Sequence, residues 1–163
     1  MASSPEDEVY HDIAYRMCGD FDENVKLAKR FVTLKQQPGC EGMTLPEAIY
    51  YLWLQDKQVE FDYQTEIMGG RLRLLGSVPD FLLRHEHILV LVNGTYFHDP
   101  RYFPGKRERD EMLVARMMGS EIDGYRVTAV VTLWENDILS CQREFHFSNS
   151  LNGVETSSPP WGG

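Results

Sequence analysis

The run ILVLV at residues 88–92 restricts the choice of fold more than any other part of this chain, because it is short, apolar throughout and rich in β-branched side chains. A run of this kind is typical of a strand that is buried on both faces. Just before it, SVPDFLLR at residues 77–84 has the same character, so we predict that the two form a strand pair. A sheet covered on both faces needs flanking layers, and helices are the elements that this chain offers.

Three stretches have the pattern of helices, and they surround the predicted strands. Residues 20–36 carry acids at the start and bases later, and residues 43–58 begin with Thr44 as N-cap, Pro46 and Glu47, which together form a capping box. The third helix is expected at residues 107–123, closed by Asp123-Gly124. Further strands are expected in VEFDYQTEI (59–67) and GYRVTAVVTLWENDI (124–138), with a turn or hairpin at 68–76. This order predicts an α/β domain with a small mixed β-sheet flanked by helices.

The 163 residues suffice for one domain, which we place at residues 20–147 with its core at 43–139. An acidic arm at 1–19 precedes it and a tail rich in Ser, Gly and Pro at 148–163 follows; both are expected to be mobile or to bind protein partners. No apolar run approaches the roughly 20 residues of a membrane helix, and the start does not have the pattern of a signal peptide. An intracellular, cytoplasmic protein is therefore expected.

The cysteines and the charge exclude some functions and leave others open. The three cysteines are scattered without zinc-ligand spacing, so we expect reduced thiols and no zinc. A net charge of −9 argues against tight non-specific binding to nucleic acid. Arginines and lysines gather between residues 71 and 116, however, with acids interleaved. They form either a local basic face or an ordinary surface of mixed charge.

Asp80 and His98 are the residues in this part of the chain that are most suited to chemistry. A carboxylate at the start of a strand can ligate a hard cation such as Mg²⁺, although a Pro-Asp pair is also common in turns. A neutral histidine can accept a proton near physiological pH, although a histidine after aromatics at a strand end is more often structural.

The joint pattern is more specific than either residue. The segments MTLPEAI, VPDFLL, LVNGTYFH, RERDEML and DGYRVTAVVTLWENDI occur in that order between residues 43 and 139. In order and spacing they resemble the very short patch repair endonucleases and related members of the PD-(D/E)xK, restriction-endonuclease-like superfamily. The resemblance implies a restriction-endonuclease-like core, double-stranded DNA as substrate and Mg²⁺ as cofactor.

Carried over by position, the resemblance also implies roles for single residues. Asp80 matches the metal-binding aspartate, and Val92 matches the residue whose backbone carbonyl contacts the metal. His98 matches the histidine that acts on the attacking water or the scissile phosphate. Glu47 matches a supporting glutamate, and a capping role alone explains it equally well. The DNA-binding set would comprise the aromatics that wedge into the base stack and nearby bases: Tyr96, Phe97, Arg101, Lys106 and Arg107.

Departures from the family pattern keep other functions open. The superfamily places an acid and a lysine at alternate positions of the buried strand, where this chain has Leu91 and Asn93. The repair endonucleases have a second histidine at Asn93, which can bind phosphate but cannot act as a base. Thr95 replaces one of their zinc ligands. Three hypotheses follow: an active endonuclease, a catalytically inactive nuclease fold that binds DNA or protein, and a structural subunit of an assembly such as a phage particle, found in the virion.

Overall fold

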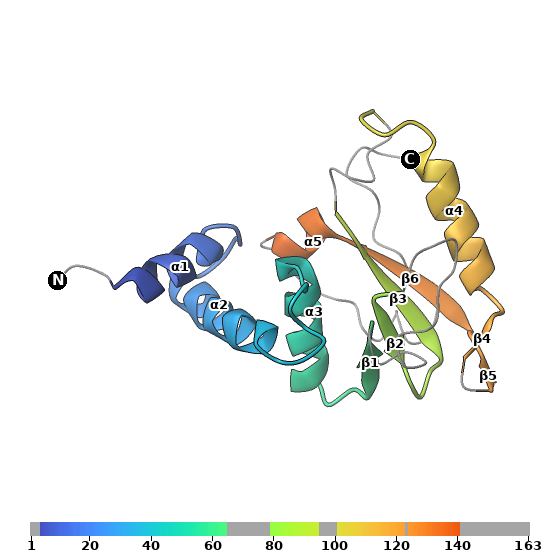
Figure 1. Ribbon diagram of the computed structural model, residues 1–163, viewed down its shortest axis with the longest axis horizontal. Helices are drawn as coiled ribbons and strands as arrows, with labels where there is room; N and C mark the ends of the chain where they lie inside the picture. The colour runs from blue at the N-terminus through green and yellow to red at the C-terminus, as the bar shows by residue number, and fades with distance from the viewer. Residues whose placement is uncertain (1–3, 65–78, 95–100, 123, 141–163) are drawn as a thin grey trace.

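A four-stranded mixed sheet forms the centre of the computed structural model, which describes residues 4–64, 79–94, 101–122 and 124–140. Its strands are β1 (Phe61–Tyr63), β2 (Phe81–Leu83), β3 (Ile88–Asn93) and β6 (Ala129–Trp134), in the spatial order β1-β2-β3-β6 (Figure 1). The pairs β1–β2 and β2–β3 are antiparallel, and β3–β6 is parallel. The predicted strand pair is therefore present, and β3 lies inside the sheet between β2 and β6.

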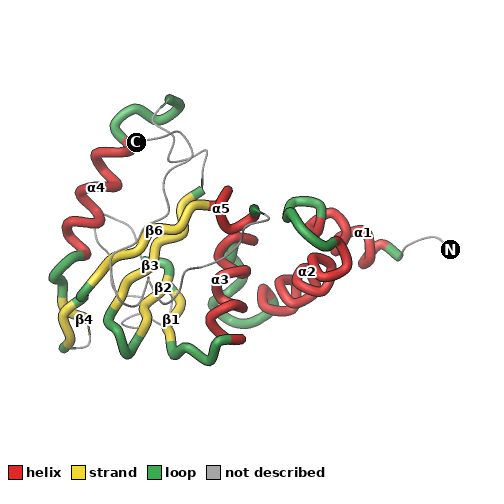
Figure 2. The backbone as a smooth tube through the Cα atoms, turned by 180° about the vertical axis from the view of Figure 1, so that it is seen from behind, coloured by secondary structure: helices red, strands yellow, loops and turns green. Residues whose placement is uncertain are grey.

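Helices cover both faces of this sheet. Helix α3 (Leu45–Asp56) lies on one face together with the short α5 (Glu135–Leu139), and α4 (Lys106–Met117) lies on the other, as the two opposite views show (Figures 1 and 2). The parallel pair requires a crossover between β3 and β6, and α4 lies in that connection. The expected α/β fold, with a small mixed sheet flanked by helices, is confirmed.

The burial of β3 follows the alternation of side chains along a strand. Ile88 and Val90 join the core beneath α3, whereas Leu89 and Leu91 join the core beneath α4. All four are buried, which explains why this stretch has no polar face.

Two helices precede the sheet-bearing part, and the sequence predicted only the second of them. Helix α2 (Phe21–Lys35) agrees with the prediction, and Phe31 and Leu34 carry its apolar side into the core beside α3. Helix α1 (Pro5–Ala14) lies within the acidic arm, which we expected to be mobile or to bind protein partners. Ser4 and Asp7 form a capping box at its start, and the helix packs against α2 (Figure 1).

The prediction of the third helix was wrong at its C-terminal end. Helix α4 stops at Met117 rather than at residue 123, because Gly119 follows in the left-handed region at φ +77°. Residues 121–122 then form β4, which pairs with β5 (Tyr125–Arg126). Gly124, at φ +84°, lies in the tight turn between them, so this glycine belongs to a hairpin and not to a helix end.

The cysteine prediction was wrong for Cys18, which is disulfide-bonded. The backbone N–H of Cys18 also donates to the carbonyl of Leu139 over 3.0 Å, so the loop after α1 is attached to the end of α5. Spacing along the chain could not show this contact, because it joins residues far apart in the sequence. Cys40 is a buried thiol, as expected. None of the helices in the described ranges is long and apolar enough to span a membrane.

Candidate metal and carboxylate site

One end of the β1–β2 pair brings together residues from three elements. Gln64 directly follows β1, Asp80 directly precedes β2, and the antiparallel register places them opposite each other. The backbone N–H of Gln64 donates to the carbonyl of Asp80 over 3.1 Å. The first turn of α3 reaches the same place and contributes Glu47. We call Glu47, Gln64 and Asp80 the carboxylate cluster.

Glu47 is both a helix-capping residue and a member of this cluster. Its Oε1 accepts hydrogen bonds from the backbone N–H and the hydroxyl of Thr44, at 3.0 and 2.8 Å. Its Oε2 accepts from the Tyr63 hydroxyl at 3.1 Å and from Gln64 Nε2 at 2.7 Å. The residue is only 6% exposed. An ionised carboxylate has about four acceptor positions, so these four donors saturate Glu47.

Gln64 connects the two carboxylates. Its Nε2 donates to Glu47 Oε2 and also to Asp80 Oδ1, the second bond being 2.9 Å long. The other oxygen of Asp80, Oδ2, accepts the backbone N–H of Val92 over 2.7 Å. Protein donors therefore hold Asp80 at both oxygens, and each oxygen keeps one further acceptor position.

The surroundings raise the pKa of Asp80 to about 7. Burial is the largest cause, because it disfavours the charged form, and the negative charge of Glu47 acts in the same direction. The hydrogen bonds from Val92 and Gln64 lower the pKa but only partly offset these effects, and a hydrogen bond with Glu47 raises it further. The pKa of Tyr63 is also raised, first by burial and then by the charge of Glu47. When both carboxylates are ionised, the cluster therefore holds like charges by means of neutral donors.

Of the other predicted residues, those within the described ranges lie on β3, on α4 and in the loop before α4. Val92 adjoins it through its backbone N–H. Asn93 is the next residue of β3 and pairs with Trp134 of β6. Alternation puts Asn93 on the face of Leu91, beneath α4, whereas Val92 packs on the α3 side. His98, Tyr96 and Phe97 lie outside the described residues.

The predicted basic DNA contacts belong to α4 and the loop before it. Lys106 lies 3.6 Å from Asp110, and Arg107 lies 3.3 Å from Glu111, so each pairs with an acid one turn further along the helix. The guanidinium of Arg101 stacks over the ring of Tyr102, 5.7 Å from its centroid. The interleaved acids noted in the sequence thus neutralise part of this basic stretch.

The donor set suits a hard cation such as Mg²⁺. The N–H and C=O groups of one strand residue point to the same side of the strand, so the Val92 carbonyl faces the edge where its N–H meets Asp80. A carboxylate and a backbone carbonyl are ligands that Mg²⁺ accepts, with water and phosphate oxygens completing its shell. Within the described ranges, no group of three or more His, Cys, Asp or Glu side chains could hold a metal ion. Any such site is therefore lean in protein ligands.

Sequence reasoning missed Gln64 and Tyr63. Both lie at the end of the strand predicted at residues 59–67, where the alternation of polar and apolar residues was visible. Their importance depends on the register between β1 and β2, which residues 65–78 separate in the sequence. A polar residue at the end of a strand that precedes a Pro-Asp strand was the available signal.

Fold and site together define an α/β protein with three layers and a carboxylate cluster at one end of its sheet. Comparisons of the chain with protein-family models, with curated proteins and with solved structures found no match. The geometry of the cluster is therefore the basis for inferring a function.

Proposed function

We propose that the protein is a Mg²⁺-dependent DNA endonuclease that cleaves a phosphodiester bond at the carboxylate cluster. The observation that carries the proposal is the position of Asp80. Its carboxylate is fixed by Gln64 and the Val92 N–H, and when ionised it retains acceptor positions for a cation. Two carboxylates meet here, and the described residues that donate hydrogen bonds to their oxygens are all neutral, so a divalent cation would relieve their repulsion.

The order of elements supports the finer assignment of a restriction-endonuclease-like core. From α3 onward the main elements run helix, strand, strand, strand, helix and strand, leaving aside the small β4–β5 hairpin. This is the order on which the resemblance to the very short patch repair endonucleases depends. Asp80 directly precedes the second of these strands and Val92 lies near the end of the third, as the resemblance implies for the metal-binding residues.

In this mechanism, Asp80 and the Val92 carbonyl would hold the metal, and bound Mg²⁺ would supply a polarised phosphate oxygen and an activated water. Glu47 is saturated by its four donors and therefore anchors Asp80 instead of binding the metal directly. We assign proton acceptance from the water to His98, and phosphate binding to Asn93, from the resemblance. Arg101, Lys106 and Arg107 supply positive charge for the DNA backbone, with Tyr96 and Phe97 as base-stacking residues.

A second candidate is a catalytically inactive protein of the same architecture that binds DNA or a protein partner. The packing of Leu91 favours it, because this position carries an acid in the wider superfamily and here lies in the apolar core beneath α4. The net charge of −9 also favours a partner other than bare DNA. In this case the carboxylate cluster would serve only to fix α3 to the end of the sheet.

Nicking of supercoiled plasmid and cleavage of a mismatched duplex, each with Mg²⁺ or Mn²⁺, separate the two candidates. We expect metal-dependent cleavage by the unaltered protein, and losses of at least about a thousandfold for Asp80→Asn and about a hundredfold for His98→Ala. Asp62→Asn is the matched control, because Asp62 lies on the same strand pair and is engaged by Arg84. Absence of cleavage by the folded protein with either metal would reject the endonuclease and favour the inactive protein.

A further inference from the structure

We infer that Gln64 is the positioning residue of the proposed metal site: its carboxamide ties Asp80 to the saturated Glu47 and leaves the remaining acceptor positions of Asp80 open to a divalent cation. The inference rests on the proposed function and adds a residue that the resemblance did not assign. Three features of the cluster carry it.

The first feature is that one nitrogen makes both bonds. Gln64 Nε2 lies 2.7 Å from Glu47 Oε2 and 2.9 Å from Asp80 Oδ1. Both neighbours are carboxylate oxygens, which accept and do not donate when ionised, so the nitrogen and not the oxygen of the amide must face them. The two amide hydrogens then serve one carboxylate each. A shorter or apolar side chain at this position cannot make both bonds.

The second feature is that the two carboxylates differ in their remaining capacity. Four donors occupy Glu47, two from Thr44 and one each from Tyr63 and Gln64. Asp80 receives one bond from Gln64 and one from Val92. Glu47 is thus the anchor and Asp80 the available ligand, and Gln64 is the side chain that joins them.

The third feature is that the bridge is electrically neutral. A lysine or arginine at position 64 would neutralise the carboxylates and occupy the place of a cation. The glutamine restrains them by hydrogen bonds but leaves their charge in place. Gln64 therefore satisfies two opposing requirements, since it holds like charges together and preserves the attraction for a metal ion.

The test compares Gln64→Met, which keeps the length but removes both donors, with Gln64→Lys, which keeps a donor and adds charge. Gln55→Met is the matched control, because Gln55 is exposed on α3 away from the cluster. Mn²⁺ affinity by isothermal titration, unfolding temperature and plasmid nicking are measured for each. We expect about tenfold weaker Mn²⁺ binding for Gln64→Met, the loss of one hydrogen bond to a charged group. For Gln64→Lys we expect at least about a hundredfold weaker binding, with an unfolding temperature no lower than that of Gln64→Met.

The outcomes separate this inference from the proposed function. If Gln64 only stabilises the fold, Gln64→Met lowers the unfolding temperature and binds Mn²⁺ as the unaltered protein does, which overturns the inference while nicking can persist. If the unaltered protein binds Mn²⁺ but cuts no DNA, the endonuclease proposal fails and the affinities of the two variants still decide the role of Gln64. If the unaltered protein does not bind Mn²⁺, both are overturned.

Discussion

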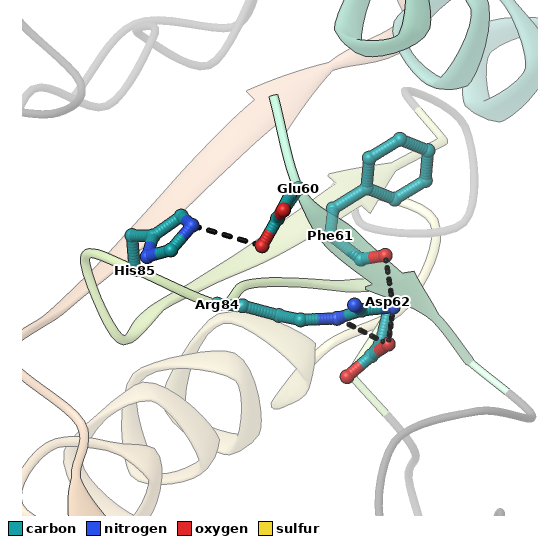
Figure 3. Close-up of polar contacts among 5 residues, drawn as sticks. All are labelled: Glu60, Phe61, Asp62, Arg84 and His85. Carbon is teal, nitrogen blue, oxygen red and sulfur yellow. Dashed lines mark hydrogen bonds and ion pairs between the residues drawn. The ribbon is translucent and has the colours of Figure 1, made fainter. Parts of the chain in front are cut away.

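The strand pair β1–β2 carries carboxylates at both of its ends, and the two ends treat them differently. At the end where β1 begins, Arg84 donates to Asp62 and to the carbonyl of Phe61, and His85 lies 2.8 Å from Glu60 (Figure 3). These partners are cationic or can become so, and the side chains of Arg84 and His85 are 51% and 72% exposed. At the other end, the carboxylates of the cluster meet an amide, hydroxyls and a backbone N–H.

This difference between the two ends indicates which of them would attract a cation. At the exposed end, charge is already compensated and water screens what remains, so little energy depends on it. At the cluster, burial disfavours the charged form of Asp80 and the charge of Glu47 adds to this, which is why the pKa of Asp80 rises. The two ends share strands and residue types, so their contrast can be tested with matched substitutions.

The largest loss of stability is expected for a substitution of Glu47. Glu47→Ala removes the capping box of α3 and the carboxylate oxygen that accepts hydrogen bonds from the Tyr63 hydroxyl and from Gln64 Nε2. We expect the free energy of unfolding to fall by about 3 kcal/mol, measured by urea denaturation. Glu60→Ala, at the exposed end, should change it by less than about 0.5 kcal/mol. Equal effects at the two positions would contradict the contrast.

The contribution of Asp80 to the stability of the fold should be large and should depend on pH. The folded-state pKa of about 7 exceeds the unfolded value of 3.8, so the folded protein binds more protons between these values. Stability contributed by this group is therefore present below about pH 4, falls as the pH rises to about 7, and then stays low.

Asp80→Asn mimics the protonated carboxyl and removes this slope. At about pH 8 the variant should be more stable than the unaltered protein by roughly 2–4 kcal/mol, and the difference should vanish near pH 4. Denaturation at a series of pH values measures it. A variant that is less stable at pH 8 would mean that Asp80 is ionised and well solvated in the fold.

Arg84 should have a small effect on stability. Arg84→Met keeps the aliphatic part of the side chain but removes the bonds to Asp62 and Phe61. We expect a loss of at most about 1 kcal/mol, and a smaller one in about 1 M salt because screening weakens exposed pairs. A loss above about 2 kcal/mol, unchanged by salt, would show that this end is as sensitive as the cluster.

The smallest change in stability is expected for a substitution of His85. Its ring nitrogen contacts Glu60, but both side chains are largely exposed, at 72% and 61%. His85→Gln should change the unfolding free energy by less than about 0.5 kcal/mol at neutral pH, in the same denaturation assay. It should also leave Mn²⁺ binding unaltered, since it lies at the end opposite to Asp80.

The sequence predicted the parts of the fold that local patterns determine. The apolar run at β3 indicated a strand covered on both faces, and Thr44 with Glu47 marked the start of α3 correctly. The capping box at Ser4 was just as local but was overlooked within an acidic segment. The prediction for the end of α4 was wrong for another reason. Helix propensity continues to Met118, and only the backbone conformation of Gly119 ends the helix.

The two acidic residues of the site could be predicted from the sequence, but the residues that connect them could not. Asp80 and Glu47 were identified as candidates, and the structure places them in one cluster. Gln64 and Tyr63 acquire their roles through the antiparallel register of β1 and β2, a tertiary feature that a single sequence does not encode locally. The same holds for the Val92 N–H, whose bond to Asp80 depends on the register between β2 and β3.

Mn²⁺ titration followed by NMR tests the central claim most directly, because the paramagnetic ion broadens the signals of nuclei close to where it binds. The account predicts early loss of the backbone amide signals of Gln64, Phe81 and Val92, while those of Asp62 and Arg84 at the other end of the same strands persist to higher Mn²⁺ concentrations. Asp80→Asn should abolish this selectivity. Loss of signal first at the exposed acids of α1 or at Asp62, with the Val92 amide unaffected, would contradict a metal site at the carboxylate cluster.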